Sequence, residues 1–115
     1  MLLYSVADKI VFSILKRINV GFLEIATFSG EVLKFGNPND KLKVNLKIKN
    51  SALNFNLIKG GSIGFAECYM RDEFETNSLS DLIELTARNI NIMHKFAGVL
   101  DLKFLNFIKN RFIKN

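Results

Sequence analysis

Apolar side chains recur every three or four positions over residues 2–18, which is the period of an amphipathic α-helix. The apolar positions of this stripe are Leu3, Val6, Ile10, Ile14 and Ile18. Gly21 interrupts the pattern. Two short runs of β-prone residues follow at 22–28 and 31–35, and Ser29-Gly30 between them is typical of a hairpin turn. The start of the chain therefore predicts a helix followed by a β-hairpin.

Polar and apolar residues alternate without interruption over 41–49, after a loop at 36–40. Alternation with a period of two predicts a β-strand with one buried face and one face lined mostly by lysine. We interpret the lysine face as a solvated sheet surface, which also discourages pairing with other chains. An anion-binding surface is the alternative interpretation.

The next stretch predicts a short helix and then a strand. Asn50 or Ser51 can cap a helix that runs to about Lys59, and Gly60 stands where a left-handed C-terminal cap belongs. Residues 63–70 have the pattern of a strand whose small residues share one face; these are Gly64, Ala66 and Cys68. Because the glycines at 60 and 61 would then precede a strand and not a helix, we interpret them as a turn and not as a phosphate-binding loop.

Further elements complete the fold prediction. A short β-prone run lies at 74–76, Ser78 with Asp81 forms a variant of the capping box before a helix, and apolar residues continue at helical spacing over 92–112. The sequence thus predicts one α+β domain over 1–115, because no linker divides it. We expect a small, mainly antiparallel sheet of about five strands, packed against N-terminal, central and C-terminal helices.

Composition narrows the functional classes. Hydrophobic residues make up 49% of the chain, with 11 Phe and no Trp, so the interior is expected to be unusually apolar. The net charge of +5 favours an anionic partner such as nucleic acid or anionic lipid. With one cysteine, no signal-peptide pattern and no apolar run long enough to span a membrane, a cytoplasmic location is expected.

The sequence offers little catalytic chemistry. His94 is the single histidine and has no other ligand at metal-binding spacing, while Cys68 lies among apolar residues that would raise its pKa. Glu67 is expected to form an ion pair with Arg71 or Arg88, or to face outward. We therefore expect no catalytic residue, no cofactor and no metal site in this chain.

A longer motif gives the sequence a resemblance to a known family. It consists of Gly60, Gly61, Gly64, Glu67, Tyr69 and Met70, followed by a Leu-rich segment that ends in Asn89. This region resembles the N-terminal domain of cyclopropane-fatty-acyl-phospholipid synthases, which are S-adenosylmethionine-dependent methyltransferases that act on membrane phospholipids. The resemblance covers about residues 20–91. One departure is Arg71-Asp72-Glu73-Phe74, which stands where the family has Asp-Gly-x-Trp.

The resemblance implies a non-catalytic role, because in the family cofactor binding and catalysis belong to a separate C-terminal domain that nothing in this chain matches. The element order is also similar to that of sterol-carrier-type lipid-transfer domains. The resemblance therefore implies a lipid- or membrane-binding accessory domain that presents phospholipid acyl chains to a methyltransferase domain elsewhere. The alternative is a protein interaction module that docks a separately encoded methyltransferase subunit without lipid contact.

The expected partners follow from these two hypotheses. They are a phospholipid or anionic membrane surface and a methyltransferase domain or subunit, with the chain attached peripherally to the inner face of the membrane. Nucleic acid is disfavoured, because no aromatic platform accompanies the basic stretches, and a homodimer is left open. The candidate lipid-contact residues combine apolar and basic side chains in the C-terminal stretch: Phe104, Phe107, Lys109, Arg111 and Phe112.

Overall fold

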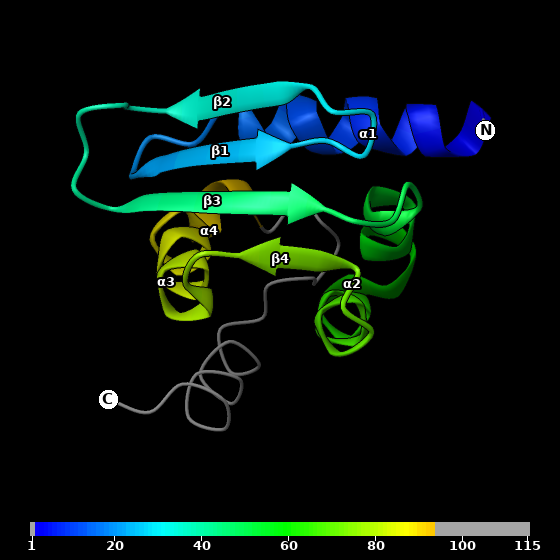
Figure 1. Ribbon diagram of the computed structural model, residues 1–115. Coiled ribbons are helices and arrows are strands. Elements are labelled where there is room, and N and C mark those ends of the chain that lie inside the picture. The colour runs from blue at the N-terminus through cyan, green and yellow to red at the C-terminus, as the bar shows by residue number, and fades with distance from the viewer. Residues whose placement is uncertain (1, 94–115) are drawn as a thin grey trace.

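The computed structural model describes residues 2–93 of the chain. Its helices are α1 (Leu2–Leu15), α2 (Leu53–Met70), α3 (Leu79–Arg88) and α4 (Ile90–Met93), and its strands are β1 (Phe22–Ala26), β2 (Val32–Gly36), β3 (Lys43–Ile48) and β4 (Phe74–Thr76) (Figure 1). The N-terminal helix, the hairpin, the strand within 41–49 and the helix after Ser78 are confirmed. The helix expected over 92–112 lies almost entirely outside the described residues.

The strands form one mixed sheet in the order β2-β1-β3-β4. β1 pairs antiparallel with β2 and β3 pairs antiparallel with β4, whereas β1 and β3 run parallel. The parallel pair arises because the chain leaves β2, passes the start of β1 and enters β3 on the other side of β1. The expected α+β class is confirmed, but the sheet has four strands within residues 2–93 and not about five.

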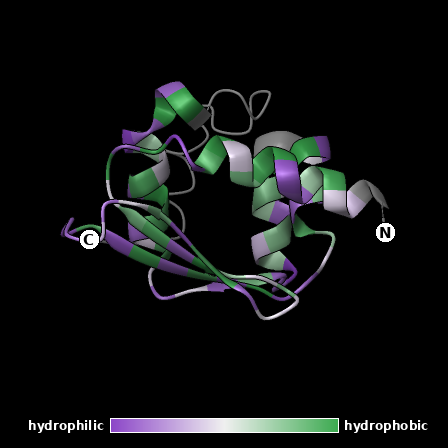
Figure 2. Cartoon of the chain, turned by 90° about the horizontal axis from the view of Figure 1, so that it is seen from above, coloured by the Kyte–Doolittle hydropathy of each residue, from purple (hydrophilic) through white to green (hydrophobic). Residues whose placement is uncertain are grey.

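All the described helices lie on one face of the sheet (Figure 2). The side chains of β3 show why: Val44 is fully buried toward the helices, whereas Lys43 and Lys47 are exposed on the opposite face. The solvated lysine face expected from the alternation is confirmed. The core that fills the space under the helices consists of Val11, Leu15, Ile18, Leu23, Ile25, Phe35, Val44, Ile48, Leu53, Cys68, Phe74, Leu82, Ile83 and Leu85.

The stretch 63–70, expected as a strand, is the second half of helix α2. Its buried residues Gly64 and Cys68 are four positions apart and share one helical face, while Glu67 between them is exposed. The small residues at 64, 66 and 68 recur every second position, which is the period of a strand and led to the wrong prediction. This helical segment accounts for the missing fifth strand.

Helix α2 bends between Asn56 and Gly64. A Cβ atom added to Gly64 would lie 2.6 Å from the carbonyl oxygen of Asn56, although eight residues of straight helix span about 12 Å. Figure 1 shows the two halves of α2 as separate coils. Gly60, expected to cap the end of a helix, and Gly61, expected in the turn after it, therefore lie within the bend of α2. The absent side chain of Gly64 lets the two halves of the helix touch.

Asn89 connects the end of α3 by hydrogen bonds to the segment between α1 and β1, and it is 2% exposed. Its Oδ1 accepts hydrogen bonds from the amides of Asn19 (3.0 Å) and Val20 (3.2 Å). Its Nδ2 donates to the carbonyls of Val20 (2.9 Å) and Leu85 (2.8 Å). Asn89 thereby holds the end of α3 beside the residues that lead into β1.

The turn from α2 into β4 contains a left-handed residue. Asp72 has φ = 59°, a conformation that glycine adopts without strain and that aspartate tolerates better than most residues. Lys49 Nζ contacts Asp72 Oδ2 at 2.6 Å and Glu75 Oε1 at 3.2 Å, which holds the turn beside β3. After the turn, Phe74 enters the core and is 2% exposed.

Candidate apolar binding site

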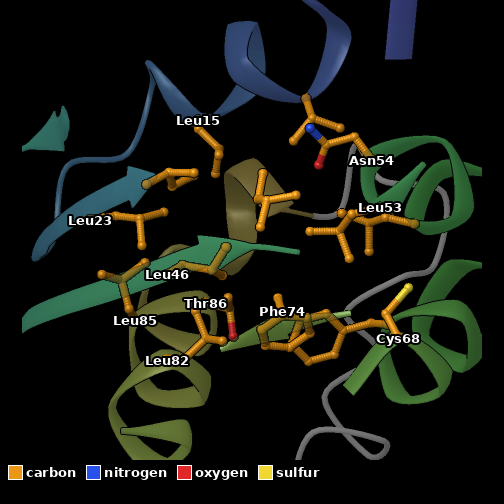
Figure 3. Close-up of a pocket in the computed structure, with 15 residues that line it drawn as sticks. Leu15, Leu23, Leu46, Leu53, Asn54, Cys68, Phe74, Leu82, Leu85 and Thr86 are labelled. Carbon is orange, nitrogen blue, oxygen red and sulfur yellow. The ribbon is translucent and has the colours of Figure 1, made fainter. Parts of the chain in front are cut away.

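An apolar cavity lies between the sheet and helices α1, α2 and α3. Figure 3 shows side chains from both layers arranged around it. Its lining comes from every described element except β2 and α4: Val11, Leu15, Leu23, Ile25, Leu46, Ile48, Leu53, Asn54, Leu57, Phe65, Cys68, Phe74, Leu82, Leu85 and Thr86. The alternation of the strands and the inner stripes of the helices together direct these side chains inward.

The polar atoms of the lining are already satisfied. Asn54 Nδ2 donates to Asp8 Oδ1 at 3.0 Å, and Thr86 Oγ1 donates to the carbonyl of Ile83 at 2.8 Å. Within residues 2–93, every described buried side-chain nitrogen or oxygen has a hydrogen-bond partner. The cavity therefore presents no polar group that a ligand would need to satisfy, and an apolar group is what it can hold.

The size of the cavity limits its occupant. An apolar cavity of about 150 Å³ stays dry and admits benzene. The cavity described here has a volume of about 80 Å³. It has room for the end of an acyl chain, but not for a whole chain.

A small polar cluster lies where Cys68 reaches the turn before β4. Cys68 is fully buried. Its burial, as the main cause, and its hydrogen bond to the Glu73 carboxylate, as the second, raise the pKa of the thiol to about 12. Arg71 Nε donates to Glu73 Oε2 at 2.6 Å and lowers the pKa of that carboxyl below its usual value. Because the thiol is protonated at neutral pH, the cluster is suited to structure and not to nucleophilic catalysis.

The residues of the predicted motif do not converge on the cavity. Glu67, Tyr69 and Met70 are exposed on α2, and Glu67 forms no ion pair in the described part of the chain, where Arg71 pairs with Glu73. Gly60, Gly61 and Gly64 lie in α2 and Asn89 ends α3; none of the seven motif residues lines the cavity. The candidate lipid contacts Phe104, Phe107, Lys109, Arg111 and Phe112, and also His94, lie outside the described residues.

Sequence reasoning missed the cavity, because its lining is assembled from six elements that are far apart along the chain. The one available signal was compositional: a Phe-rich chain with few polar core residues indicates an apolar interior. Among residues 2–93, no group of three His, Cys, Asp or Glu side chains could hold a metal ion. No helix in the same part of the chain is long and apolar enough to cross a membrane.

Comparisons of the chain with protein-family models, with curated proteins and with solved structures found no match. The resemblance drawn from the motif therefore remains a prediction.

Proposed function

We propose that this domain is a non-catalytic accessory module that holds the end of a phospholipid acyl chain and presents the lipid to a methyltransferase domain of the cyclopropane-fatty-acyl-phospholipid synthase type. The observation that carries the proposal is the apolar cavity, whose few polar atoms are all satisfied within the protein. A site of this kind selects for hydrocarbon and offers no group for chemistry. The methyl transfer itself is assigned to the partner domain.

The local structure at the departure from the family pattern supports the resemblance. Asp72 occupies the position of the family glycine, and its φ of 59° is one that glycine favours. Phe74 occupies the position of the family tryptophan and is buried in the cavity wall. Both substitutions are compatible with the turn and the aromatic anchor that the family pattern implies.

The overall arrangement is compatible with the sterol-carrier-like order expected from the sequence. A first helix, consecutive strands, a central helix, a further strand and later helices follow one another along the chain. We extend the proposal to location: the domain works at the inner face of a membrane, where its lipid resides. The C-terminal residues Phe104, Phe107, Lys109, Arg111 and Phe112 remain predicted lipid contacts.

The test is binding of cis-parinaric acid, a fatty acid whose fluorescent tetraene lies in its acyl chain. We expect the fluorescence of the probe to increase with the wild type. Val11→Phe places a ring into the cavity and should abolish this increase, while Val11→Ile, a smaller addition, should weaken it. Val32→Phe is the matched control, because Val32 is 55% exposed on β2 and does not line the cavity. Far-UV circular dichroism reports whether each variant is folded.

Equal binding by the wild type and by folded Val11 variants would refute the cavity as the site. Absence of binding by the wild type would refute the function itself. Loss of binding in Val32→Phe as well would show that the probe binds to the outside of the protein.

One observation favours the alternative of a docking module. Ile63, Tyr69 and Met70 on the second half of α2 are 65%, 38% and 65% exposed, and two of them belong to the predicted motif. Large exposed apolar side chains gathered on one element are typical of a surface that another protein covers. Met70→Asp should then abolish co-purification with a methyltransferase subunit while leaving fatty-acid binding intact, and Val32→Asp should change neither.

A further inference from the structure

Helix α1 presents different chemistry on its two sides. Val11 and Leu15 point inward and line the cavity, and both are less than a tenth exposed. The outward positions form one stripe of apolar and basic residues along the helix and the turn that follows it: Val6, Lys9, Ile10, Ser13, Lys16 and Arg17. The acid of this helix, Asp8, is partly buried and accepts a hydrogen bond from Asn54. The outward stripe therefore carries positive charge without an acid.

The other described surfaces that combine basic and apolar side chains also carry carboxylates. On the outer face of the sheet, Lys34 lies opposite Glu24 and Lys47 lies opposite Glu75, whereas Lys43 lies opposite Phe22, so two of these three lysines have a carboxylate as cross-strand neighbour. The exposed apolar residues of α2 lie beside the acidic Glu67. On α2, Lys59 and the exposed Ile63 lie four positions apart, but the acidic Glu67 follows Ile63 at the same spacing; on α1 the half-exposed apolar and the basic side chains share one face without an acid.

We propose that the outward face of α1 is the surface by which this domain lies on an anionic phospholipid bilayer. Val6 and Ile10, which are 45% and 46% exposed, would enter the boundary between headgroups and acyl chains, while Lys9, Lys16 and Arg17 would contact the anionic headgroups. The inference deepens the proposed function, because the opposite side of the same helix lines the cavity. A lipid chain that leaves the bilayer beside α1 would reach the cavity around a single helix.

The experiment is co-sedimentation of the full chain with vesicles of phosphatidylglycerol and phosphatidylcholine in equal parts, and with vesicles of phosphatidylcholine alone. Each basic residue close to an anionic surface contributes about fivefold to partitioning, so Lys9→Gln with Lys16→Gln should weaken binding to the anionic vesicles about 25-fold. The matched control is Lys41→Gln with Lys43→Gln, which removes the same charge from the sheet side. High salt should weaken wild-type binding because it screens these contacts.

The apolar contribution has its own matched pair. Ile10→Ser should weaken binding to the anionic vesicles, whereas Ile63→Ser, an equivalent change at a 65% exposed isoleucine of α2, should not. Equal losses in the α1 variants and in their controls would overturn the inference, since binding would then follow overall charge or hydrophobicity. Retained binding in the α1 variants, with loss only in Phe104→Ser and Phe107→Ser, would also overturn it and place the contact in the C-terminal stretch.

Failure of this inference can be separated from failure of the proposed function. Binding of cis-parinaric acid is measured without vesicles, and Val11→Phe should abolish it while leaving vesicle binding unchanged. A chain that binds the fatty acid but whose α1 variants sediment like the wild type retains the proposed function and loses the docking face. A chain that binds anionic vesicles through α1 but takes up no fatty acid retains the docking face and loses the proposed function.

Discussion

Replacing Asn89 with alanine is expected to lower the free energy of unfolding by about 3 kcal/mol. The side-chain amide makes four hydrogen bonds at 2.8–3.2 Å, three of them to the backbone of Asn19 and Val20. The fourth bond is donated to the carbonyl of Leu85, and this carbonyl would still accept a helical hydrogen bond from the backbone amide of residue 89 at 3.2 Å. The three bonds to the connection are therefore the ones that are lost, at about 1 kcal/mol each. In thermal unfolding this corresponds to a fall in Tm of roughly 10 °C.

The assay is urea unfolding followed by far-UV circular dichroism, because the chain has no tryptophan. Asn91→Ala is the control: Asn91 lies two positions further on and is exposed, so its loss should change stability by less than about 0.5 kcal/mol. Asn89→Asp keeps the shape of the side chain but places a carboxylate oxygen, which can only accept, against the carbonyls of Val20 and Leu85. At neutral pH it should therefore lower the free energy of unfolding at least as much as Asn89→Ala does. Equal stability of Asn89→Ala and Asn91→Ala would refute the role of Asn89 as the tie between α3 and β1.

Other predictions concern the bend of α2, the turn after it and the carboxylates. In urea unfolding, Gly64→Ala should destabilise the protein by about 1–3 kcal/mol, because the added Cβ would lie 2.6 Å from a backbone oxygen. At Gly60 an added Cβ meets nothing within 4 Å, so Gly60→Ala should stabilise the protein by up to about 1 kcal/mol. A Gly64→Ala variant more stable than Gly60→Ala would exclude the bend. Asp72→Gly should be about 1 kcal/mol more stable than Asp72→Ala, since both lose the ion pair and only glycine relieves the positive φ; equal urea midpoints would contradict this. Hydrogen bonds lower the pKa values of Glu73 and Asp40 in the folded protein below the unfolded values of 4.5 and 3.8. The stabilisation from these carboxylates should therefore be complete above the unfolded values and be lost as the pH falls below them, and the loss should be smaller in Glu73→Gln. An unchanged urea midpoint down to pH 3 would rule out this contribution.

The sequence was sufficient where local chemistry and tertiary packing agree. The alternation over 41–49 and the cap at Ser78, whose Oγ accepts a hydrogen bond from the amide of Asp81 at 3.1 Å, both predict elements that the structure contains. It failed at 60–70, where three glycines, Gly60, Gly61 and Gly64, weaken a helix locally by about 1 kcal/mol each. The helix persists there because Gly64 and Cys68 pack into the interior, and a pattern of small residues does not reveal that contact.

The candidate site was predicted less well than the fold, for a physical reason. A cavity is defined by what several elements leave unfilled, and residues such as Leu23, Leu57 and Leu82 are indistinguishable in sequence from ordinary core positions. A motif, by contrast, is contiguous and easily seen, yet its conspicuous members Tyr69 and Met70 lie on the outside of α2. The sequence therefore emphasised a surface, whereas the structure reveals the interior.

This separation decides how the two functional hypotheses can be tested. The cavity and the exposed part of the motif occupy opposite sides of α2, because Leu57, Phe65 and Cys68 point inward while Glu67 and Met70 point outward. If the resemblance reflects shared function, the outward residues must act through a partner, since they cannot reach an acyl chain held in the cavity. A Met70→Asp variant that binds the fatty acid but loses the methyltransferase subunit would show that lipid holding and docking are two tasks of one domain. Loss of both activities together would instead mean that the outer surface of α2 supports the cavity wall, and the docking hypothesis would then have no independent support.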